Sequence, residues 1–306
     1  MQCADTLLTI GIPVYNGDKF LFDVLDSLFN QVIKQPDVEV LICDNASTDK
    51  TSEIVSQFSG GRYIRHDINM GYDRNVDSIF MNSRGMYVWI LAADDLILPG
   101  GVDKIIKLLR SGCVKDVLFV GGSERQGQSR ESVSVNNGDD FFRLTGFKNG
   151  AVSTNIIRTE SWVSVDREPY CTSYWIHFAV VIDLAVNGGI VFFDPLVGEH
   201  PQAVAVKKAW SNNGSKIPIG LELLKILSQM RQKDYSDDTC RAAIMVIKGA
   251  YPRQLASARS EGLNLSLNMI FKMMSILRMY PTFWLVDLPV LLMPKLFWKF
   301  VRRVRL

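Results

Sequence analysis

Apolar residues in the first 120 positions alternate between two spacings. Short runs of consecutive apolar residues predict buried β-strands at residues 7–12, 38–43, 63–65, 86–91 and 116–120. Between these runs, apolar residues recur at helical spacing and predict helices around residues 20–28, 54–58, 76–80 and 105–109. Strand–helix alternation of this kind predicts an α/β fold, a mostly parallel sheet with helices on both faces.

The pattern changes further along the chain. Residues 121–150 are polar and glycine-rich, so we expect them to lie outside the sheet. A second mixed region follows, with an apolar helix near 175–186 and a strand at 190–193. Residues 207–218 are typical of a loop, and the remainder is almost wholly helical. We therefore expect an α/β domain over residues 1–205, with two halves meeting near residue 120, and a helical region over 206–306.

Composition excludes several classes of protein. The 34 basic and 32 acidic residues nearly balance, which argues against a nucleic-acid binder. The five cysteines have no CxxC spacing, which argues against a zinc ribbon, a redox motif or a disulfide framework and fits a reducing compartment. The sequence predicts no export signal and no transmembrane helix, because it has no long uninterrupted apolar run.

Three short strings each follow a predicted strand directly. They are Pro13–Asn16 (PVYN), Asp44–Asp49 (DNASTD) and Ala93–Asp95 (ADD). Ligands of open parallel sheets bind beyond the carboxyl ends of the strands. We therefore expect the three strings to converge at one edge of the sheet.

The DNASTD string suits a nucleoside. Asp44 and Asn45 can hydrogen-bond a base or ribose edge, while Ser47, Thr48 or Asp49 can cap the next helix. A capped turn without a ligand is the alternative.

The ADD string is more demanding. Asp94 and Asp95 repel each other, and a divalent cation with a bound diphosphate would relieve that repulsion. A solvated turn before Pro99 is the alternative.

Together these strings resemble glycosyltransferase family 2, whose members have the GT-A fold. The matching segments are IPVYN (12–16), CDNASTDKT (43–51), NMGYDRN (69–75) and LAADD (91–95). The resemblance covers residues 7–110 and thins beyond residue 120. NMGYDRN is weakly similar to O-antigen and capsule sugar transferases, including abequosyltransferase-like members. The resemblance implies a GT-A catalytic domain that binds a nucleotide with residues 1–120 and the acceptor with residues 121–205.

The resemblance also implies roles for single residues at the donor site. Pro13 and Tyr15 would border the nucleotide, Asp44 would accept a hydrogen bond from the base, Arg74 would lie near the base or diphosphate, Asp94 would face the donor sugar or ribose, and Asp95 would coordinate Mn²⁺ or Mg²⁺. Lys207, Lys208 and Trp210 would form either a lid over the pyrophosphate or an ordinary loop.

The sequence departs from the family where the general base is expected. Family members usually place a Glu-Asp pair at a helix start, followed by a glycine, a strand, a proline and often a histidine. Here Asn187–Gly189 and Pro195 match the later pattern, and counting back puts His177 at the base position. Imidazole can accept a proton near neutral pH, since its unperturbed pKa is about 6.5. A partly buried structural histidine is the alternative, and Glu168 and Asp183 are the other candidate bases.

His200 matches the histidine that completes the metal site in some relatives of the family. Its alternative is a surface turn in the GEHPQ string.

The last twelve residues, KLFWKFVRRVRL, mix five cations with aromatic side chains. This pattern predicts an interfacial helix on anionic lipid, with a solvated basic end as the alternative. The resemblance then implies an inverting transferase that takes a sugar from a nucleotide-sugar to a polyprenyl-linked acceptor, in the cytoplasm on the inner face of the cell membrane. The rivals are a non-catalytic nucleotide-sugar-binding or scaffold subunit and a sugar-phosphate nucleotidyltransferase. The latter would carry a GxGxR-type loop after the first strand, where this chain has PVYNGDK.

Overall fold

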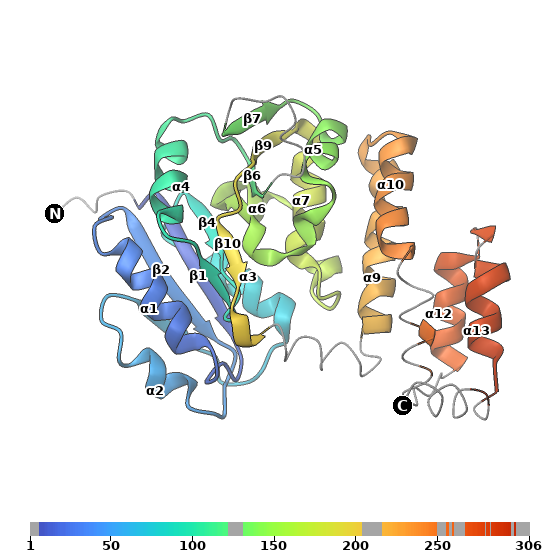
Figure 1. The fold of residues 1–306 in the computed structure, drawn as a ribbon, viewed down its shortest axis with the longest axis horizontal. Coiled ribbons are helices and arrows are strands. Elements are labelled where there is room, and N and C mark those ends of the chain that lie inside the picture. Colours follow the sequence, from blue (N-terminus) through green and yellow to red (C-terminus); the bar gives the residue numbers. More distant parts are fainter. Residues whose placement is uncertain are drawn as a thin grey trace. The chain divides into compact units, whose positions relative to one another are not determined.

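The computed structural model describes residues 6–121, 131–203, 216–249, 255–256, 259, 267–278, 280–281, 283–294 and 297. Contacts within the chain divide it into two units, residues 1–203 and residues 204–306. Figure 1 shows a sheet flanked by helices in the first unit and helices in the second.

The first unit contains an eight-stranded sheet in the order β3-β2-β1-β4-β8-β6-β9-β7. Its strands are β1 (Leu8–Val14), β2 (Val38–Asp44), β3 (Arg62–Arg65), β4 (Tyr87–Ile90), β6 (Val117–Val120), β7 (Ser132–Val135), β8 (Asn155–Arg158) and β9 (Gly189–Phe192). The first four are mutually parallel, β8 is antiparallel to both of its neighbours, and β7 is antiparallel to β9. The predicted mostly parallel sheet is confirmed.

Helices cover both faces of this sheet. The α-helices are α1 (Leu21–Val32), α2 (Thr51–Val55), α3 (Tyr72–Asn82), α4 (Gly101–Arg110), α5 (Gly138–Thr145), α6 (Thr159–Ser164) and α7 (Ile176–Leu184). Alternate β1 residues such as Ile10 and Ile12 form one core with α1, α2 and α4. On the opposite face, β1 packs on α3, where Gly11 leaves room for Ile79. Strands buried on both faces explain why the sequence shows continuous apolar runs there.

The expectation that residues 121–150 lie outside the sheet is wrong for residues 132–135, which form β7 at its edge. Ser132–Val135 alternates serine and valine, as an edge strand with one exposed face can, so it lacks the continuous apolar run of a central strand. Gly188 has φ of +85° and lies against Val135, whose carbonyl oxygen would be only 2.0 Å from an added Cβ. Glycine is therefore required where the chain enters β9.

A small second sheet joins the acidic pair to a later segment. Strand β5 (Asp95–Ile97) pairs antiparallel with β10 (Val197–Glu199), and Asp95 lies opposite Glu199. The backbone N–H of His200 donates to the carbonyl oxygen of Asp94 at 3.0 Å. Two segments far apart in the sequence thus meet at Asp94 and Asp95.

The second unit is helical in the part that the structure describes. It contains α9 (Lys216–Ser228), α10 (Asp237–Lys248), α12 (Leu267–Leu277), a π-helical turn (Phe283–Asp287) and α13 (Leu288–Leu292). The expected loop 207–218 lies outside the described residues up to 215, and its last three residues already belong to α9. Among the described residues, no helix combines the length and the apolar character needed to cross a membrane.

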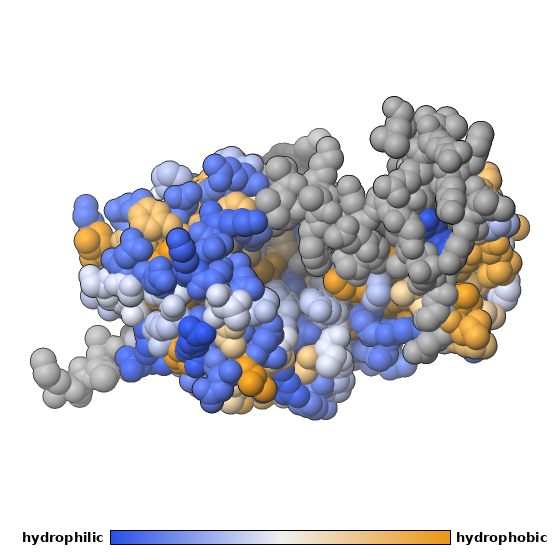
Figure 2. Space-filling model, turned by 90° about the horizontal axis from the view of Figure 1, so that it is seen from below, coloured by the Kyte–Doolittle hydropathy of each residue, from blue (hydrophilic) through white to orange (hydrophobic). Residues whose placement is uncertain are grey.

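Apolar side chains are exposed on α12, the π-helical turn and α13. Figure 2 shows an apolar surface gathered at that end of the second unit. The exposed residues are Leu267, Phe271, Trp284, Leu285, Val286 and Leu292. We call these six residues the apolar face. Of the predicted interfacial segment 295–306, only Phe297 is described, and it is exposed.

Candidate donor and catalytic site

The loops after β1 and β2 are bonded to each other. The backbone N–H of Asn16 donates to Ser47 Oγ at 2.9 Å, and Asn16 Oδ1 accepts the N–H of Thr48 at 2.8 Å. Asn16 and Ala46 both have positive φ, 53° and 63°. Such backbone conformations are uncommon outside glycine and often mark sites where the surrounding structure fixes the chain. The predicted convergence of these two strings is confirmed.

Asn45 joins a third loop to this pair. Its Nδ2 donates to Asn69 Oδ1 at 2.8 Å and to the carbonyl oxygen of Gly71 at 3.1 Å, while its Oδ1 accepts the N–H of Met70 at 2.8 Å. The NMGYDRN segment therefore enters α3 directly beside the DNASTD loop. Because one amide side chain makes all three bonds, the loops are held as a single unit.

Asp44 ends β2 and is fully buried. Its Oδ1 accepts the N–H of Ser47 at 2.8 Å, and its Oδ2 accepts the hydroxyl of Tyr63 at 2.5 Å. Burial, and next the bond to Asp44, raise the pKa of Tyr63 to about 12. The carboxylate thus shapes the loop from inside, whereas we expected it to contact the base of the donor.

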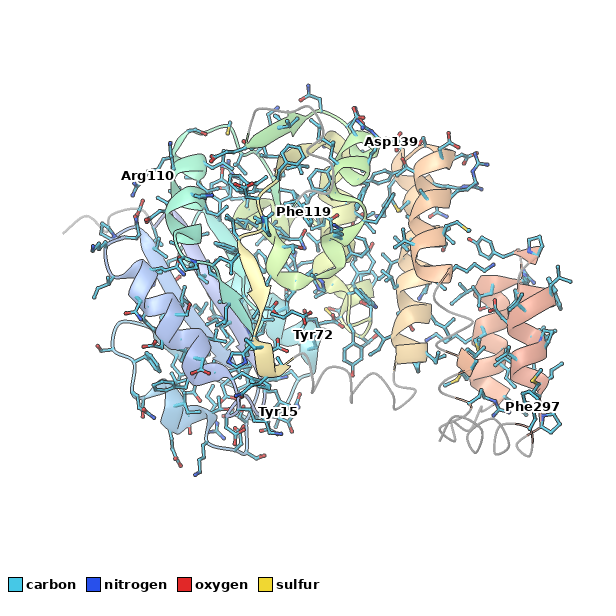
Figure 3. All side chains as sticks on the ribbon, viewed as in Figure 1. Tyr15, Tyr72, Arg110, Phe119, Asp139 and Phe297 are labelled. Atoms are coloured by element: carbon cyan, nitrogen blue, oxygen red, sulfur yellow. The ribbon has the colours of Figure 1, made fainter. Side chains whose placement is uncertain are left out.

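The two other residues expected at the nucleotide differ in exposure. Pro13 is half-buried within β1, and Tyr15 is 49% exposed in the loop that follows. Figure 3 places Tyr15 and Tyr72 at the same end of the first unit's sheet. Tyr15 therefore lies exposed at the strand ends, where the resemblance puts a residue that borders the nucleotide mainly through its loop backbone.

Arg74 has a different partner from the one expected. Its guanidinium forms an ion pair with Glu168 at 2.5 Å, and both side chains are largely exposed. Exposed pairs of this kind add little stability, about 0–1 kcal/mol. Arg74 was expected near the base or diphosphate, and Glu168 was an alternative base. The structure pairs them on the surface, between α3 and the turn Glu168–Tyr170.

The acidic pair is supported by a buried serine. Asp95 Oδ2 accepts the hydroxyl of Ser153 at 2.7 Å, and the same Oγ accepts the N–H of Ala92 at 2.9 Å. Trp89 Nε1 donates to the carbonyl oxygen of Ser153 at 2.8 Å. The segment around Ser153 thus fixes both the loop after β4 and one carboxylate of the pair.

The donor set at Asp94 and Asp95 fits a hard divalent cation. The described residues contain no group of three or more His, Cys, Asp or Glu side chains placed to hold a metal. Mg²⁺ commonly takes only one or two protein carboxylates and completes its shell with substrate phosphates and water. Asp95 and its neighbour Asp94 therefore meet the number of protein carboxylates that such an ion needs.

His200 does not contribute a ring nitrogen to that site. Its backbone lies against Asp94, but its Nε2 is 2.9 Å from Asp23 Oδ2, and its Nδ1 accepts the N–H of Gln202 at 3.3 Å. The ring is buried and packs against Phe20. The expected metal ligand is therefore turned toward α1, with both nitrogens engaged.

His177 lies at the start of α7, where the spacing predicted the base. It is only 3% exposed, and its ring nitrogens face the carbonyl oxygen of Gly150 at 3.0 Å and the hydroxyl of Tyr72 at 3.5 Å. A carbonyl can only accept, so Nε2 carries the proton and Nδ1 faces Tyr72. Burial lowers the pKa of His177 to about 4. The imidazole is therefore a weaker base than its unperturbed pKa predicts, and among the described residues the Tyr72 hydroxyl lies beside its Nδ1.

Asp183, the other alternative base, lies six residues further along α7, roughly 9 Å along the helix axis. Its Oδ2 accepts the hydroxyl of Tyr170 at 3.4 Å.

Tyr72 lies beside His177 and close enough to the acidic pair for its charges to act on the Tyr72 hydroxyl. It is the first residue of α3, and burial, followed by the charges of Asp73, Asp95 and Asp94, raises the pKa of its hydroxyl. Tyr72 was not among the predicted site residues. The sequence does carry a signal for it, since Tyr72 directly follows a glycine at the start of a predicted helix, within the NMGYDRN segment.

Ser153 and Asp73 were missed as well, and no local pattern around Ser153 marks it. Lys207, Lys208 and Trp210, the expected lid, lie outside the described residues.

Comparison with known proteins agrees with this geometry. The profile of Glycosyl transferase family 2 matches residues 9–161, half of the chain. The chain therefore belongs to glycosyltransferase family 2. The match includes the loops after β1 and β2, the NMGYDRN segment, the acidic pair and Ser153.

Two curated relatives illustrate how far the sequence similarity extends. Abequosyltransferase RfbV of Salmonella typhimurium is 35% identical over 96 residues, 30% of this chain and 29% of the relative. Chondroitin synthase of Escherichia coli is 34% identical over 116 residues, 35% of this chain and 16% of the relative. The chain thus matches less than a third of the length of either relative.

Solved structures show the same fold over most of the chain. S. aureus TarS has a TM-score of 0.62 at 17% identity, covering 90% of this chain and 49% of that one. Mannosyltransferase PcManGT from Pyrobaculum calidifontis, in complex with GDP-Man and Mn²⁺, has a TM-score of 0.58 at 15% identity, covering 90% and 81%. The GT-A fold implied by the sequence motifs is confirmed.

Proposed function

We propose that this chain is an inverting glycosyltransferase that moves a sugar from a nucleoside-diphosphate sugar to a hydroxyl of a lipid-linked glycan. The observation that carries this proposal is the joining of three loops by Asn16 and Asn45 at the end of the sheet that also holds Asp94 and Asp95. Nucleotide-sugar complexes of structural neighbours, including GDP-Man with Mn²⁺ and UDP-GlcNAc, support a donor of this class.

Asp95 would hold Mn²⁺ or Mg²⁺, and Asp94 would face the donor sugar or ribose. A metal bound there would offset the negative charge that develops on the departing nucleoside diphosphate. Ser153 keeps Asp95 oriented, which favours one rotamer of that carboxylate before any substrate binds. Tyr15 borders the nucleotide, and Asp44 keeps the loop that receives it in shape.

The proton of the acceptor hydroxyl passes to His177 through Tyr72. The Tyr72 oxygen accepts that proton as its own proton moves to Nδ1 of His177, so Tyr72 ends neutral and the imidazole ends protonated. The bond from Nε2–H to Gly150 fixes the tautomer that leaves Nδ1 free to accept. The acceptor oxygen attacks the anomeric carbon from the face opposite the diphosphate, which inverts its configuration.

A lipid-linked acceptor is supported by the second unit and by one relative. The apolar face and the basic residues of 295–306 together suit an anionic bilayer surface. The similarity to an abequosyltransferase of Salmonella supports a role in bacterial surface polysaccharide synthesis. We propose that the protein acts on the cytoplasmic, inner face of the cell membrane.

A non-catalytic nucleotide-sugar-binding subunit is the second candidate, because α7 begins with a buried imidazole where a carboxylate is usual. A screen of UDP-, dTDP-, GDP- and CDP-sugars with Mn²⁺, read by the shift in melting temperature and by release of nucleoside diphosphate, distinguishes the two. The enzyme should release diphosphate with one donor, and both EDTA and Asp95→Asn should stop the release. Stabilisation without release, even with membrane extract as the acceptor source, would favour the binding subunit.

A further inference from the structure

Tyr174 has an unusual backbone for an exposed aromatic residue. It lies two residues before α7, its φ is +65°, and 52% of its surface is exposed. Bulky residues rarely adopt this left-handed conformation, and they keep it only where the surrounding structure holds them there.

Asp73 holds Tyr174 in this conformation. The buried carboxylate accepts the N–H of Tyr174 at 2.7 Å and the N–H of Ile176 at 3.1 Å. The intervening N–H, of Trp175, donates to Ser173 Oγ at 2.9 Å. Burial raises the pKa of Asp73 even though these backbone bonds oppose the shift. Three consecutive amides are therefore fixed by buried side chains, at the expense of desolvating a carboxylate.

The two bonds from Asp73 hold the Tyr174 ring beside the proposed site. The rings of Tyr174 and Tyr72 are nearly parallel, with 13° between their planes and 6.4 Å between centroids. Tyr72 is also the residue that feels the charges of Asp94 and Asp95. Tyr174 belongs to the segment that leads into α7, three residues before His177, whereas the nucleotide loops follow β1 and β2.

We propose that Tyr174 is a stacking surface for a pyranose ring of the acceptor glycan. This inference rests on the proposed function and adds the acceptor side of the same site. One face of a pyranose is lined with C–H groups, which pack on the apolar, electron-rich face of an aromatic ring. The strained backbone of Tyr174, which Asp73 maintains, would serve binding if it holds that aromatic face toward the substrate. A nucleoside base is the less suitable occupant, because Tyr174 belongs to the segment before α7 and not to the loops after β1 and β2.

The test uses a substitution that removes the ring and also relieves the backbone. Tyr174→Gly should fold at least as well as the parent, since glycine adopts positive φ readily. Tyr174→Phe keeps the ring. Asp234→Gly is the matched control, because Asp234 is also exposed with positive φ, 61°, but lies in the second unit.

Saturation-transfer NMR with methyl glycosides of glucose, galactose, mannose and N-acetylglucosamine measures pyranose binding directly. At least one glycoside should bind the parent, Tyr174→Phe and Asp234→Gly alike, and bind Tyr174→Gly roughly 3- to 10-fold more weakly. Equal binding to the parent and Tyr174→Gly, or no binding to the parent, would overturn the inference.

Nucleotide-sugar binding with Mn²⁺, measured on the same four proteins, separates this inference from the proposed function. Tyr174→Gly should bind the donor as the parent does. Loss of donor binding in Tyr174→Gly alone would make Tyr174 a donor contact and overturn the inference. Glycoside binding through Tyr174 without donor binding in any of the four proteins would instead overturn the proposed function.

Discussion

The hydroxyl of Ser153 donates to the carboxylate of Asp95 across 58 residues of sequence. The same oxygen accepts the N–H of Ala92, so one buried hydroxyl fixes both the backbone and the side chain of the acidic loop. The segment from 148 to 154, which directly precedes β8, thereby supports the proposed metal site, which follows the neighbouring strand β4.

Ser153→Ala should weaken the metal site without removing a ligand. Partners that orient metal ligands typically contribute about 10- to 100-fold to metal affinity or activity. We expect the Mn²⁺ concentration for half-maximal donor hydrolysis to rise by about that factor, with a smaller change in turnover at saturating Mn²⁺. Ser164→Ala is the control, since that hydroxyl donates to the carbonyl oxygen of Ser161 in its own helix. An unchanged Mn²⁺ requirement in Ser153→Ala would show that Asp95 needs no such support.

The bond between Tyr63 and Asp44 predicts an indirect effect on donor binding. Asp44→Ala should lower donor affinity by roughly 1–3 kcal/mol, because the N–H of Ser47 and the hydroxyl of Tyr63 both lose their acceptor. Tyr63→Phe should lower it by a smaller amount, although Tyr63 makes no proposed contact with the donor. Calorimetry with the nucleotide-sugar and Mn²⁺ measures both effects.

Tyr87→Phe is the control for the loss of a buried tyrosine hydroxyl. That hydroxyl donates to Val114 at the other end of the sheet, so its removal should cost stability and leave donor affinity intact. If donor affinity is unchanged in both Asp44→Ala and Tyr63→Phe, then Asp44 neither binds the donor nor supports the loop that does.

The central strands and the donor loops were predictable because each leaves a local signal. Strands buried on both faces show as continuous apolar runs, and the loop residues Asn16 and Asp44 follow them directly. Edge strand β7 left no such run. The partners of the predicted site residues were not predictable, because they depend on side-chain direction. Arg74 turns to Glu168, and His200 turns to Asp23, although both backbones lie near the expected place.

The apolar face predicts association with anionic lipid bilayers. Leu285→Asp combined with Phe271→Asp should strongly reduce sedimentation with vesicles containing phosphatidylglycerol, since each change puts a charge where apolar surface would enter the interface. Ile33→Asp is the matched control, because Ile33 is also highly exposed but lies in the first unit. Equal sedimentation of all three proteins at low salt would show that this face does not meet lipid.

Deleting residues 295–306 tests the electrostatic part separately. Five cations at an anionic surface contribute about 1 kcal/mol each before salt screening. The deletion should therefore reduce binding at low salt, and high salt should reduce binding of the intact chain toward the same level. Turnover on a short soluble acceptor should not change. Binding that is independent of both salt and the deletion would show that these residues do not contact lipid.

His177 predicts a specific dependence of stability on pH. Its pKa in the folded protein, about 4, is lower than the unperturbed 6.5. The unfolded chain therefore binds more protons between these values, so the stability that the neutral ring contributes is complete above about pH 6.5 and is lost as pH falls toward 4. Between pH 7 and pH 5 the expected loss of unfolding free energy from this residue is about 2 kcal/mol.

His177→Gln should remove that component while keeping a donor for Gly150 and an acceptor for Tyr72. Urea unfolding at pH 7 and pH 5 should show that the variant loses about 2 kcal/mol less than the parent on acidification. Because the amide cannot take a proton from Tyr72, turnover should also fall by about 10²–10⁴, with donor affinity retained. Tyr72→Phe should lower turnover equally if the proton passes through its hydroxyl. A variant with normal pH dependence would contradict the buried, neutral state of His177, and normal turnover in Tyr72→Phe would remove the relay.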